Sequence, residues 1–213
     1  MPTREESIQQ SVSIIRQISE EPGSGRVPSF NDAHVLKALN LIESSDGLGR
    51  QQLSRELGLG EGTVRTLIRR LRNEGLIDTS RRGMTLSEDG LVILSSLKLV
   101  LKDIQMLKTP ITVGPMNHAI LVKGGGRNVK RGIEQRDAAI IVGAKGATTL
   151  VHEGGELKMP GIEMDLDPAA LDEISGRLVP EEGDAVVIGT ADDPLLAEIA
   201  AISAALVLLT GLN

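Results

Sequence analysis

One helical segment limits the fold of this chain more than any other feature. From Thr63 onward, apolar residues recur at i, i+3, i+4 and i+7, which predicts a helix with one buried face. The stripe consists of Val64, Leu67, Ile68 and Leu71. The run 73–75 ends in glycine and supplies a helix stop. A shorter helix is expected over 50–57, and glycines within 58–62 favour a tight turn between the two helices.

The residues on either side extend this pattern. Ser29-Phe30-Asn31-Asp32 offers capping side chains ahead of an apolar run, which predicts a helix that ends near 45–47. After the striped helix, two short β-compatible stretches, 76–80 and 84–87, meet at Arg81-Arg82-Gly83. A glycine at the bend predicts a hairpin.

This order of helix, helix, turn, helix and hairpin resembles the winged-helix DNA-binding domain of prokaryotic transcription regulators. The resemblance covers 29–108 and is carried by the small helix 51–57, the opening Thr63-Val64-Arg65, the ending Leu71-Arg72-Asn73-Glu74-Gly75-Leu76-Ile77 and the wing after it. It implies a recognition helix that enters the major groove. The whole chain is also similar to archaeal two-domain proteins whose C-terminal domain has no assigned function, which implies no activity.

Charge supports the DNA-binding interpretation. The chain has a net charge of −6, yet 50–82 holds eight arginines against four acidic residues, whereas 109–213 holds eight basic against fifteen acidic residues. Arginine can bond the O6 and N7 atoms of guanine as well as phosphates. The expected contacts with duplex DNA are Arg50, Gln51, Thr63, Arg65, Thr66, Arg69, Arg70, Arg81 and Arg82.

Each of these residues has an expected role. Arg65 would contact a base, and Arg69 and Arg70 a base edge or a phosphate. Thr63 and Thr66 suit a phosphate or a thymine methyl, Arg50 and Gln51 would anchor the DNA backbone, and Arg81 and Arg82 would follow phosphates or enter the minor groove. Two alternatives remain open: the arginines form only a solvated face, or the winged helix binds another protein.

Composition excludes several other classes of site. The chain has no Cys, Trp or Tyr and a single Phe, so disulfides, thiolate metal sites and base-stacking platforms for single-stranded nucleic acid cannot be built. His34, His118 and His152 lack metal-ligand spacing, and no serine has a nucleophile-elbow pattern. We therefore expect no cofactor, no metal and no catalytic residue. Glu163, Asp165 and Asp167 could hold a divalent cation or form a solvated acidic loop.

Two helices are expected outside the winged-helix core. Glu5 to Ser19 predicts an amphipathic helix, followed by a hinge at 21–25, which packs either on its own domain or on a second subunit. A long connector helix is expected from Glu88 to Leu107. Its apolar residues at spacings of four and three make it the candidate interface of a homodimer, and burial against the winged helix is the alternative. These residues are Ile93, Leu97, Val100, Ile104 and Leu107.

The remainder alternates between strands and helices. Strands are expected at 119–122, 138–142, 148–151 and 185–188, and helices at 128–135, 168–178 and 194–209. This predicts a small α/β domain. The fold class is therefore α+β, with 1–28 as N-terminal helix and hinge, 29–108 as winged helix with connector, and 109–213 as an effector or assembly domain.

Two loops of this last domain are candidate ligand sites. Lys123, Gly124, Gly125, Gly126 and Arg127 could present amide hydrogens and positive charge to an anion, and Asp192 and Asp193 follow a strand end where α/β sheets place ligands. The alternatives are a plain loop and a helix N-cap. The segment 143–149 is expected to be a hairpin turn between strands.

The leading hypothesis is a cytoplasmic, homodimeric transcription regulator whose C-terminal domain senses a small molecule, such as a polar or anionic metabolite, or mediates oligomerisation. No signal peptide is visible, and the longest apolar run, 199–209, is 11 residues long, short of the roughly 20 that span a membrane. We therefore expect no membrane association. The alternative is an enzyme that acts on a small anionic metabolite and carries a regulatory winged helix.

Overall fold

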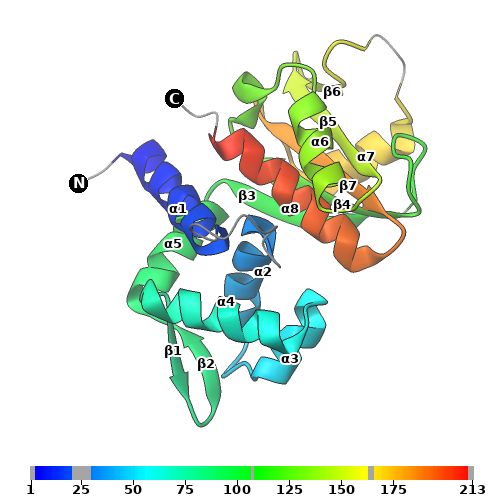
Figure 1. The fold of residues 1–213 in the computed structure, drawn as a ribbon. Helices are drawn as coiled ribbons and strands as arrows, with labels where there is room; N and C mark the ends of the chain where they lie inside the picture. The colour runs from blue at the N-terminus through cyan, green and yellow to red at the C-terminus, as the bar shows by residue number, and fades with distance from the viewer. Residues whose placement is uncertain (1–2, 21–29, 107, 163–165, 211–213) are drawn as a thin grey trace. The chain divides into compact units, whose positions relative to one another are not determined.

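The computed structural model describes residues 3–20, 30–106, 108–162 and 166–210. The expected hinge at 21–25, and Glu163 and Asp165 of the acidic segment, lie outside these residues. The chain forms two compact units, 1–97 and 98–213, which we describe separately (Figure 1).

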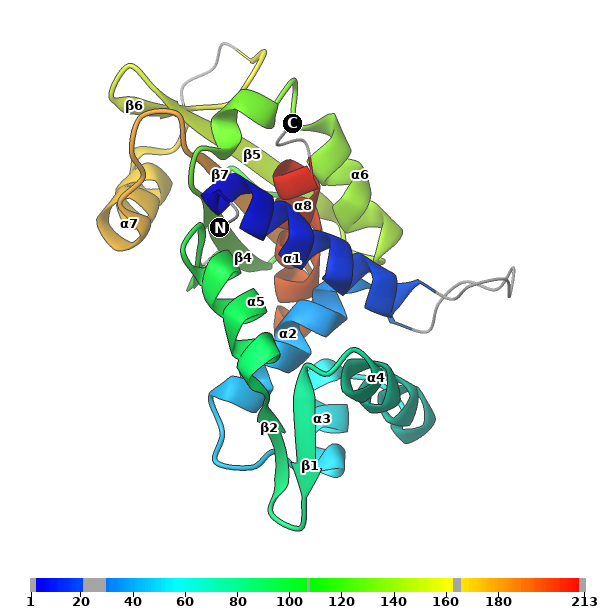
Figure 2. The same ribbon diagram turned by 90° about the vertical axis from the view of Figure 1, so that its left-hand side faces the viewer.

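The first unit contains the predicted helices and hairpin. Its elements are α1 (Arg4–Ser19), α2 (Asp32–Glu43), α3 (Arg50–Leu57), α4 (Glu61–Asn73), β1 (Ile77–Ser80), β2 (Gly83–Leu86) and most of α5 (Glu88–Lys98). β1 and β2 pair antiparallel, and Leu48 forms an isolated bridge to Met84 of β2. Figure 2 shows the hairpin extending away from the helices of this unit, as a wing does.

The core of this unit is built on the apolar stripe of α4. Val64, Leu67 and Leu71 are completely buried, and α4 packs against α3, α1 and β1. Leu53 and Leu57 of α3 are equally buried. Because these side chains fix which face of α4 points inward, the opposite face is left for solvent.

Helix α1 covers its own unit. Its capping box joins Thr3 and Glu6, and its apolar face is buried where α1 packs mainly against α2. That face consists of Ile8, Val12, Ile15 and Ile18. Of the two expectations for this helix, the structure therefore shows packing on its own domain.

The prediction of a long connector helix over 88–107 is wrong. The helix ends at Lys98, and strand β3 (Leu101–Met106) follows. From Lys102 the sequence also fits a strand, because Ile104 and Met106 are buried while Gln105 between them is exposed. Pairing with β4 satisfies the backbone and buries these side chains within the chain, so 93–106 does not form the continuous helical face on which the predicted dimer seam was based. Leu107 lies outside the described residues.

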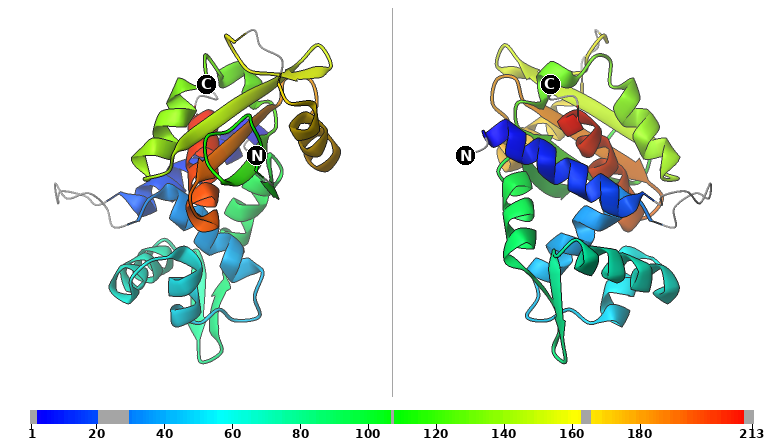
Figure 3. Two further views of the ribbon diagram at one scale, coloured as in Figure 1. Left: turned by 90° about the vertical axis from the view of Figure 1, so that its right-hand side faces the viewer. Right: turned by 60° about the vertical axis from the view of Figure 1, so that its left-hand side comes forward.

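The second unit is a five-stranded sheet with helices on both faces. After β3 come β4 (Met116–Val122), the 3-10 helix η1 (Gly125–Asn128), α6 (Ile133–Ile141), β5 (Gly146–Glu153), β6 (Glu156–Lys158), α7 (Pro168–Leu178), β7 (Ala185–Ala191) and α8 (Pro194–Thr210). The strand order is β3-β4-β7-β5-β6, and every pairing is antiparallel. Helices α6 and α8 cover one face and α7 the other (Figure 3).

Three predictions in this unit are wrong. Residues 138–142, expected as a strand, belong largely to α6. The segment 143–149 is therefore not a hairpin turn: 143–145 follow the helix, and 146–149 already belong to β5. The expected helix over 128–135 is replaced by η1 and a later start of α6. A short apolar run is compatible with a strand or a helix. Here Ala139 is buried and Ile141 is 83% exposed, which fits one face of a helix.

Helix α8 lies directly on the central strand β7 because of one glycine. A Cβ added to Gly189 would overlap the backbone nitrogen of Ala201 and the backbone oxygen of Ala197, both in α8. Neither backbone atom can move without shifting the helix.

We expect Gly189→Ala to lower the free energy of unfolding by about 3 kcal/mol or more, through overpacking. Gly176→Ala is the matched control, since Gly176 lies in α7 with nothing within 4 Å of an added Cβ. This change should stabilise the protein by roughly 1 kcal/mol through helix propensity. Denaturant unfolding followed by circular dichroism measures both, and equal effects of the two variants would refute the close approach.

Candidate nucleic-acid interface

The outward face of α4 carries a stripe of arginines. Arg65 and Arg69 are exposed and lie one turn apart, opposite the buried Val64, Leu67 and Leu71. Arg72, which is not among the contacts expected from the sequence, continues the exposed stripe. Thr63 and Thr66 are half-buried, and the Thr66 hydroxyl donates to the carbonyl of Gly62 at 3.3 Å. The geometry thus presents charge at the position of a recognition helix.

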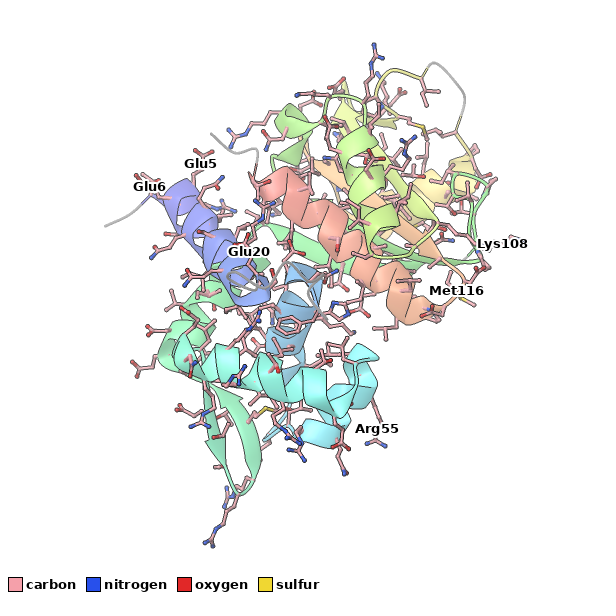
Figure 4. All side chains as sticks on the ribbon, in the orientation of Figure 1. Glu5, Glu6, Glu20, Arg55, Lys108 and Met116 are labelled. Atoms are coloured by element: carbon pink, nitrogen blue, oxygen red, sulfur yellow. The ribbon has the colours of Figure 1, made fainter. Side chains whose placement is uncertain are left out.

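Helix α3 adds polar side chains beside the start of α4. Arg50 and Gln51 are exposed in its first turn, and a guanidinium nitrogen of Arg50 lies 3.8 Å from a carboxylate oxygen of Glu61. Arg55 is exposed as well, and Figure 4 shows its side chain extending outward from α3. Arg55 is one of the eight arginines of 50–82 but is not among the contacts expected from the sequence. Only its exposed position on the folded helix identifies it as a candidate.

The wing holds Arg81 and Arg82 at an ordered turn. Both side chains are exposed, and the amide of Arg82 donates to the Ser80 hydroxyl oxygen at 3.1 Å. Gly83 has φ +128°, and an added Cβ would meet the backbone of Gly47 at 2.6 Å. The end of the wing next to its turn therefore packs closely on the loop before α3, which fixes where the two arginines are presented.

Arg70 lies on a different side of α4 and is already engaged. Its guanidinium donates to the carbonyl oxygens of Ile18 at 2.9 Å, Ser19 at 3.2 Å and Glu20 at 2.9 Å. It also stacks 5.2 Å above the centroid of the Phe30 ring. We therefore correct the assignment of Arg70: its donors are directed at the end of α1 and not at the face that carries Arg65 and Arg69.

The start of α2 contains two half-buried ionisable groups. Burial, with a smaller contribution from Lys37, lowers the pKa of His34 from 6.5 to about 4. Burial also raises the pKa of Asp32, against the opposing effect of hydrogen bonding to the Ala33 amide. His34 takes part in the capping box of α2 with Asn31. At neutral pH this histidine is uncharged and adds nothing to the basic surface.

The glycine loop of the second unit does not offer its amides to a ligand. The amide of Gly124 donates to a carboxylate oxygen of Asp184 at 2.8 Å, and that of Gly126 to the carbonyl of Gly183 at 2.9 Å. Lys123 donates its amide to Val100 at 2.9 Å, and Gly125 is buried. Lys123 and Arg127 are exposed, but the buried Asp184 places negative charge under the loop. The alternative of a plain loop describes this geometry.

Asp192 and Asp193 lie at the other end of the sheet. Val122 pairs with Ala185 and Met116 with Ala191, so the loop after β4 and the loop after β7 are at opposite ends.

The acidic residues of these loops already have partners. Asp193 accepts from the amide of Leu196 at 2.9 Å and caps α8. Asp192 pairs with Lys145 at 2.6 Å. Asp167, similarly, caps α7 through Ala170 at 3.0 Å. The structure does not combine these acidic residues with the glycine loop.

A cavity outside the ligand sites expected from the sequence opens on the α7 face. It has a volume of about 1160 Å³, and its lining includes His152, Leu157, Lys158, Met159 and Leu171. His152 Nδ1 is buried, without a hydrogen bond in the described part of the chain, 3.7 Å from Glu182. Hydrogen bonding to the Gly154 amide is the main cause that lowers the pKa of Glu182. These residues come from β5, β6 and α7, so no local sequence pattern indicated the cavity.

Other chemistry is sparse in the described residues. The ring of His118 contacts Asp103 at 3.0 Å. Within 3–20, 30–106, 108–162 and 166–210, no group of three or more His, Asp or Glu residues could hold a metal ion. Over the same ranges, no helix is long and apolar enough to cross a membrane.

Comparisons with known proteins follow the division of the chain. Residues 34–101 match the CggR N-terminal DNA binding domain, and residues 113–209 match a domain of unknown function, DUF4443. A stretch of 69 residues is 36% identical to the central glycolytic genes regulator of Bacillus subtilis (strain 168). It makes up 32% of this chain and 20% of that regulator, so the chain matches about a fifth of the length of this relative.

A solved structure matches across both units. Hypothetical protein PH0730 from Pyrococcus horikoshii OT3 is 33% identical, with a TM-score of 0.65 over 84% of this chain and 92% of its own. The chain belongs to the same family as this Pyrococcus protein. It joins a CggR-type N-terminal DNA-binding domain to a C-terminal DUF4443 domain. These findings confirm the resemblance to DNA-binding domains of transcription regulators and to two-domain proteins with a C-terminal domain of unknown function.

The lowered pKa of His34 predicts a loss of stability in mild acid. Unfolded His34 takes a proton near its ordinary value of 6.5, and folded His34 only near 4. The unfolded state therefore binds more protons between these values, and stability falls as the pH drops from about 6.5 to about 4. The full loss is on the order of 3 kcal/mol. Chemical unfolding across this range should show a steeper acid loss for the wild type than for His34→Gln, and identical slopes would contradict the assignment.

Proposed function

We propose that the protein is a transcription regulator that reads duplex DNA with α4 and the β1–β2 wing. The observation that carries the proposal is the exposed stripe of Arg65 and Arg69, which lies opposite the buried face of α4 within the region that matches a DNA-binding domain. A winged helix inserts this face into the major groove.

The arrangement suggests a division of roles among the basic residues. Arg65, near the start of α4, is placed to bond a guanine edge, with Arg69 and Arg72 one and two turns later toward the flanking phosphates. Thr63 and Thr66 supply short-range contacts. Arg50, Gln51 and Arg55 of α3 would anchor the DNA backbone. Arg81 and Arg82 would follow phosphates or enter the minor groove beside the helix.

For the second unit we propose a sensory role in the cytoplasm, where the DNA is. The cavity between β5, β6 and α7 is large enough for a small molecule, and it combines apolar side chains with His152 and Lys158. It replaces the glycine loop and the Asp192–Asp193 loop as our candidate effector site. We also propose that two copies bind DNA together, because helix–turn–helix proteins commonly read two half-sites about one helical turn apart.

Two substitutions on the outward face of α4 test the DNA-binding proposal. Arg65→Gln and Arg69→Gln should each weaken binding to duplex DNA. A residue that contacts a phosphate should also flatten the slope of log K against log salt by about one, whereas a residue that contacts a base should relax sequence preference. Binding is measured by fluorescence anisotropy with labelled duplexes at several salt concentrations.

The control for this test is Lys130→Gln, which removes an exposed positive charge from the second unit. It should leave both affinity and slope unchanged. Circular dichroism verifies that all variants are folded. If Arg65→Gln and Arg69→Gln bind as the wild type does, α4 is not the recognition helix. If Lys130→Gln weakens binding equally, the protein attracts DNA only by overall charge.

A further inference from the structure

We propose that Arg70 is a positioning residue that fixes the orientation of the recognition helix by clamping it to the C-terminal end of α1. Helix α1 precedes the segment 34–101 that matches the DNA-binding domain, so this clamp adds a part that the match does not include. The effect on DNA binding rests on the proposed function, whereas the clamp itself is a property of the first unit alone.

The clamp uses the carbonyl groups that a helix leaves without partners. An α-helix cannot satisfy its last carbonyls internally, and they carry the negative end of the helix dipole. One terminal nitrogen of the Arg70 guanidinium, Nη1, lies 2.9 to 3.2 Å from three consecutive carbonyl oxygens, those of Ile18, Ser19 and Glu20, which share its two hydrogens. A guanidinium suits this position because it is permanently charged and its planar face can also stack on an aromatic ring.

The same guanidinium also reaches the start of α2. It lies 5.2 Å from the centroid of the Phe30 ring, within the range of a cation–π contact. Phe30 is the only aromatic residue of the chain, is 3% exposed and directly precedes Asn31, the N-cap of α2. One side chain of α4 therefore meets the end of one helix and the beginning of another.

Helix α1 is a fixed support for this contact. Its apolar face is buried, the hydroxyl of Ser11 lies 2.7 Å from that of Ser96 in α5, and Gln17 donates to Glu74 just after α4 at 3.3 Å. These contacts join α1 to the rest of the first unit along much of its length. A support held in this way can resist movement of α4.

Fixing Arg70 determines where its neighbours point. Successive side chains on an α-helix are about 100° apart, so the direction of Arg70 determines the directions of Arg69 and Arg65. The apolar stripe keeps α4 against the core, but packing of apolar side chains tolerates small rotations better than charged hydrogen bonds to the end of α1 do. Loss of the clamp should therefore misalign the DNA-contacting face without removing any of its charges.

Salt dependence separates positioning from direct contact. We expect Arg70→Gln to weaken binding to labelled duplex DNA by about tenfold with an unchanged salt slope. Arg69→Gln, one residue away, is the matched control and should flatten the slope by about one if it contacts a phosphate. Phe30→Leu, which removes the ring but stays apolar, should weaken binding by itself and have little further effect in the Arg70→Gln protein.

Two results for DNA binding would overturn the proposal. A slope that falls by about one in Arg70→Gln would mean that Arg70 contacts a phosphate directly. An unchanged affinity of the folded Arg70→Gln protein would mean that the contact serves stability alone. Additive effects of Phe30→Leu and Arg70→Gln would also contradict a shared clamp.

Hydrogen exchange tests the clamp without DNA. Amide exchange in the last turn of α1 and in α4 should rise by about tenfold in Arg70→Gln, while exchange in β4 and β7 of the second unit stays the same. Unchanged exchange in α1 and α4 overturns the clamp. If the wild type binds no duplex even at low salt, the proposed function and the positioning for DNA both fail, and exchange still decides whether Arg70 holds α1 and α4 together.

Discussion

The first unit depends on the complete burial of three side chains of α4. Val64, Leu67 and Leu71 have no exposed surface, and removing any of them would leave a cavity beneath the helix. Their burial sets the inward face of α4, which in turn places Arg65, Arg69 and Arg72 on the outward face. The hydrophobic core and the candidate DNA-binding surface are therefore two sides of one helix.

Elements with strong local signals could be predicted from the sequence. The α4 stripe is one, and α7 is another, because Asp167 caps it and Pro168 occupies its first turn, which together mark its start. Elements whose apolar residues fit two periods could not be predicted. Residues 101–106 fit both a continued helix and a strand, and only pairing with the following strand β4, a contact that the local pattern does not encode, decides between them. The run 138–142 became helical because α8 and β5 cover only one side of it.

The sequence predicts which surface of the first unit carries the candidate site, but it does not predict which individual arginines belong to that surface. Arg69 and Arg70 are adjacent and chemically identical, yet one is exposed and the other binds the end of α1. That difference depends on Ile18 to Glu20, about fifty residues earlier in the chain. The glycine loop could not be predicted for the same reason. The amide of Gly124 donates to Asp184, which is sixty residues away in the sequence.

The central claim is that α4 and the wing read DNA sequence. The most direct measurement incubates the purified full chain with fragments of genomic duplex DNA at low and near-physiological salt and sequences the fragments that it retains. The account predicts enrichment of discrete, related sites that persists at the higher salt, because base contacts add to the phosphate contacts that salt weakens. Retention that disappears with salt and enriches no sequence would contradict it.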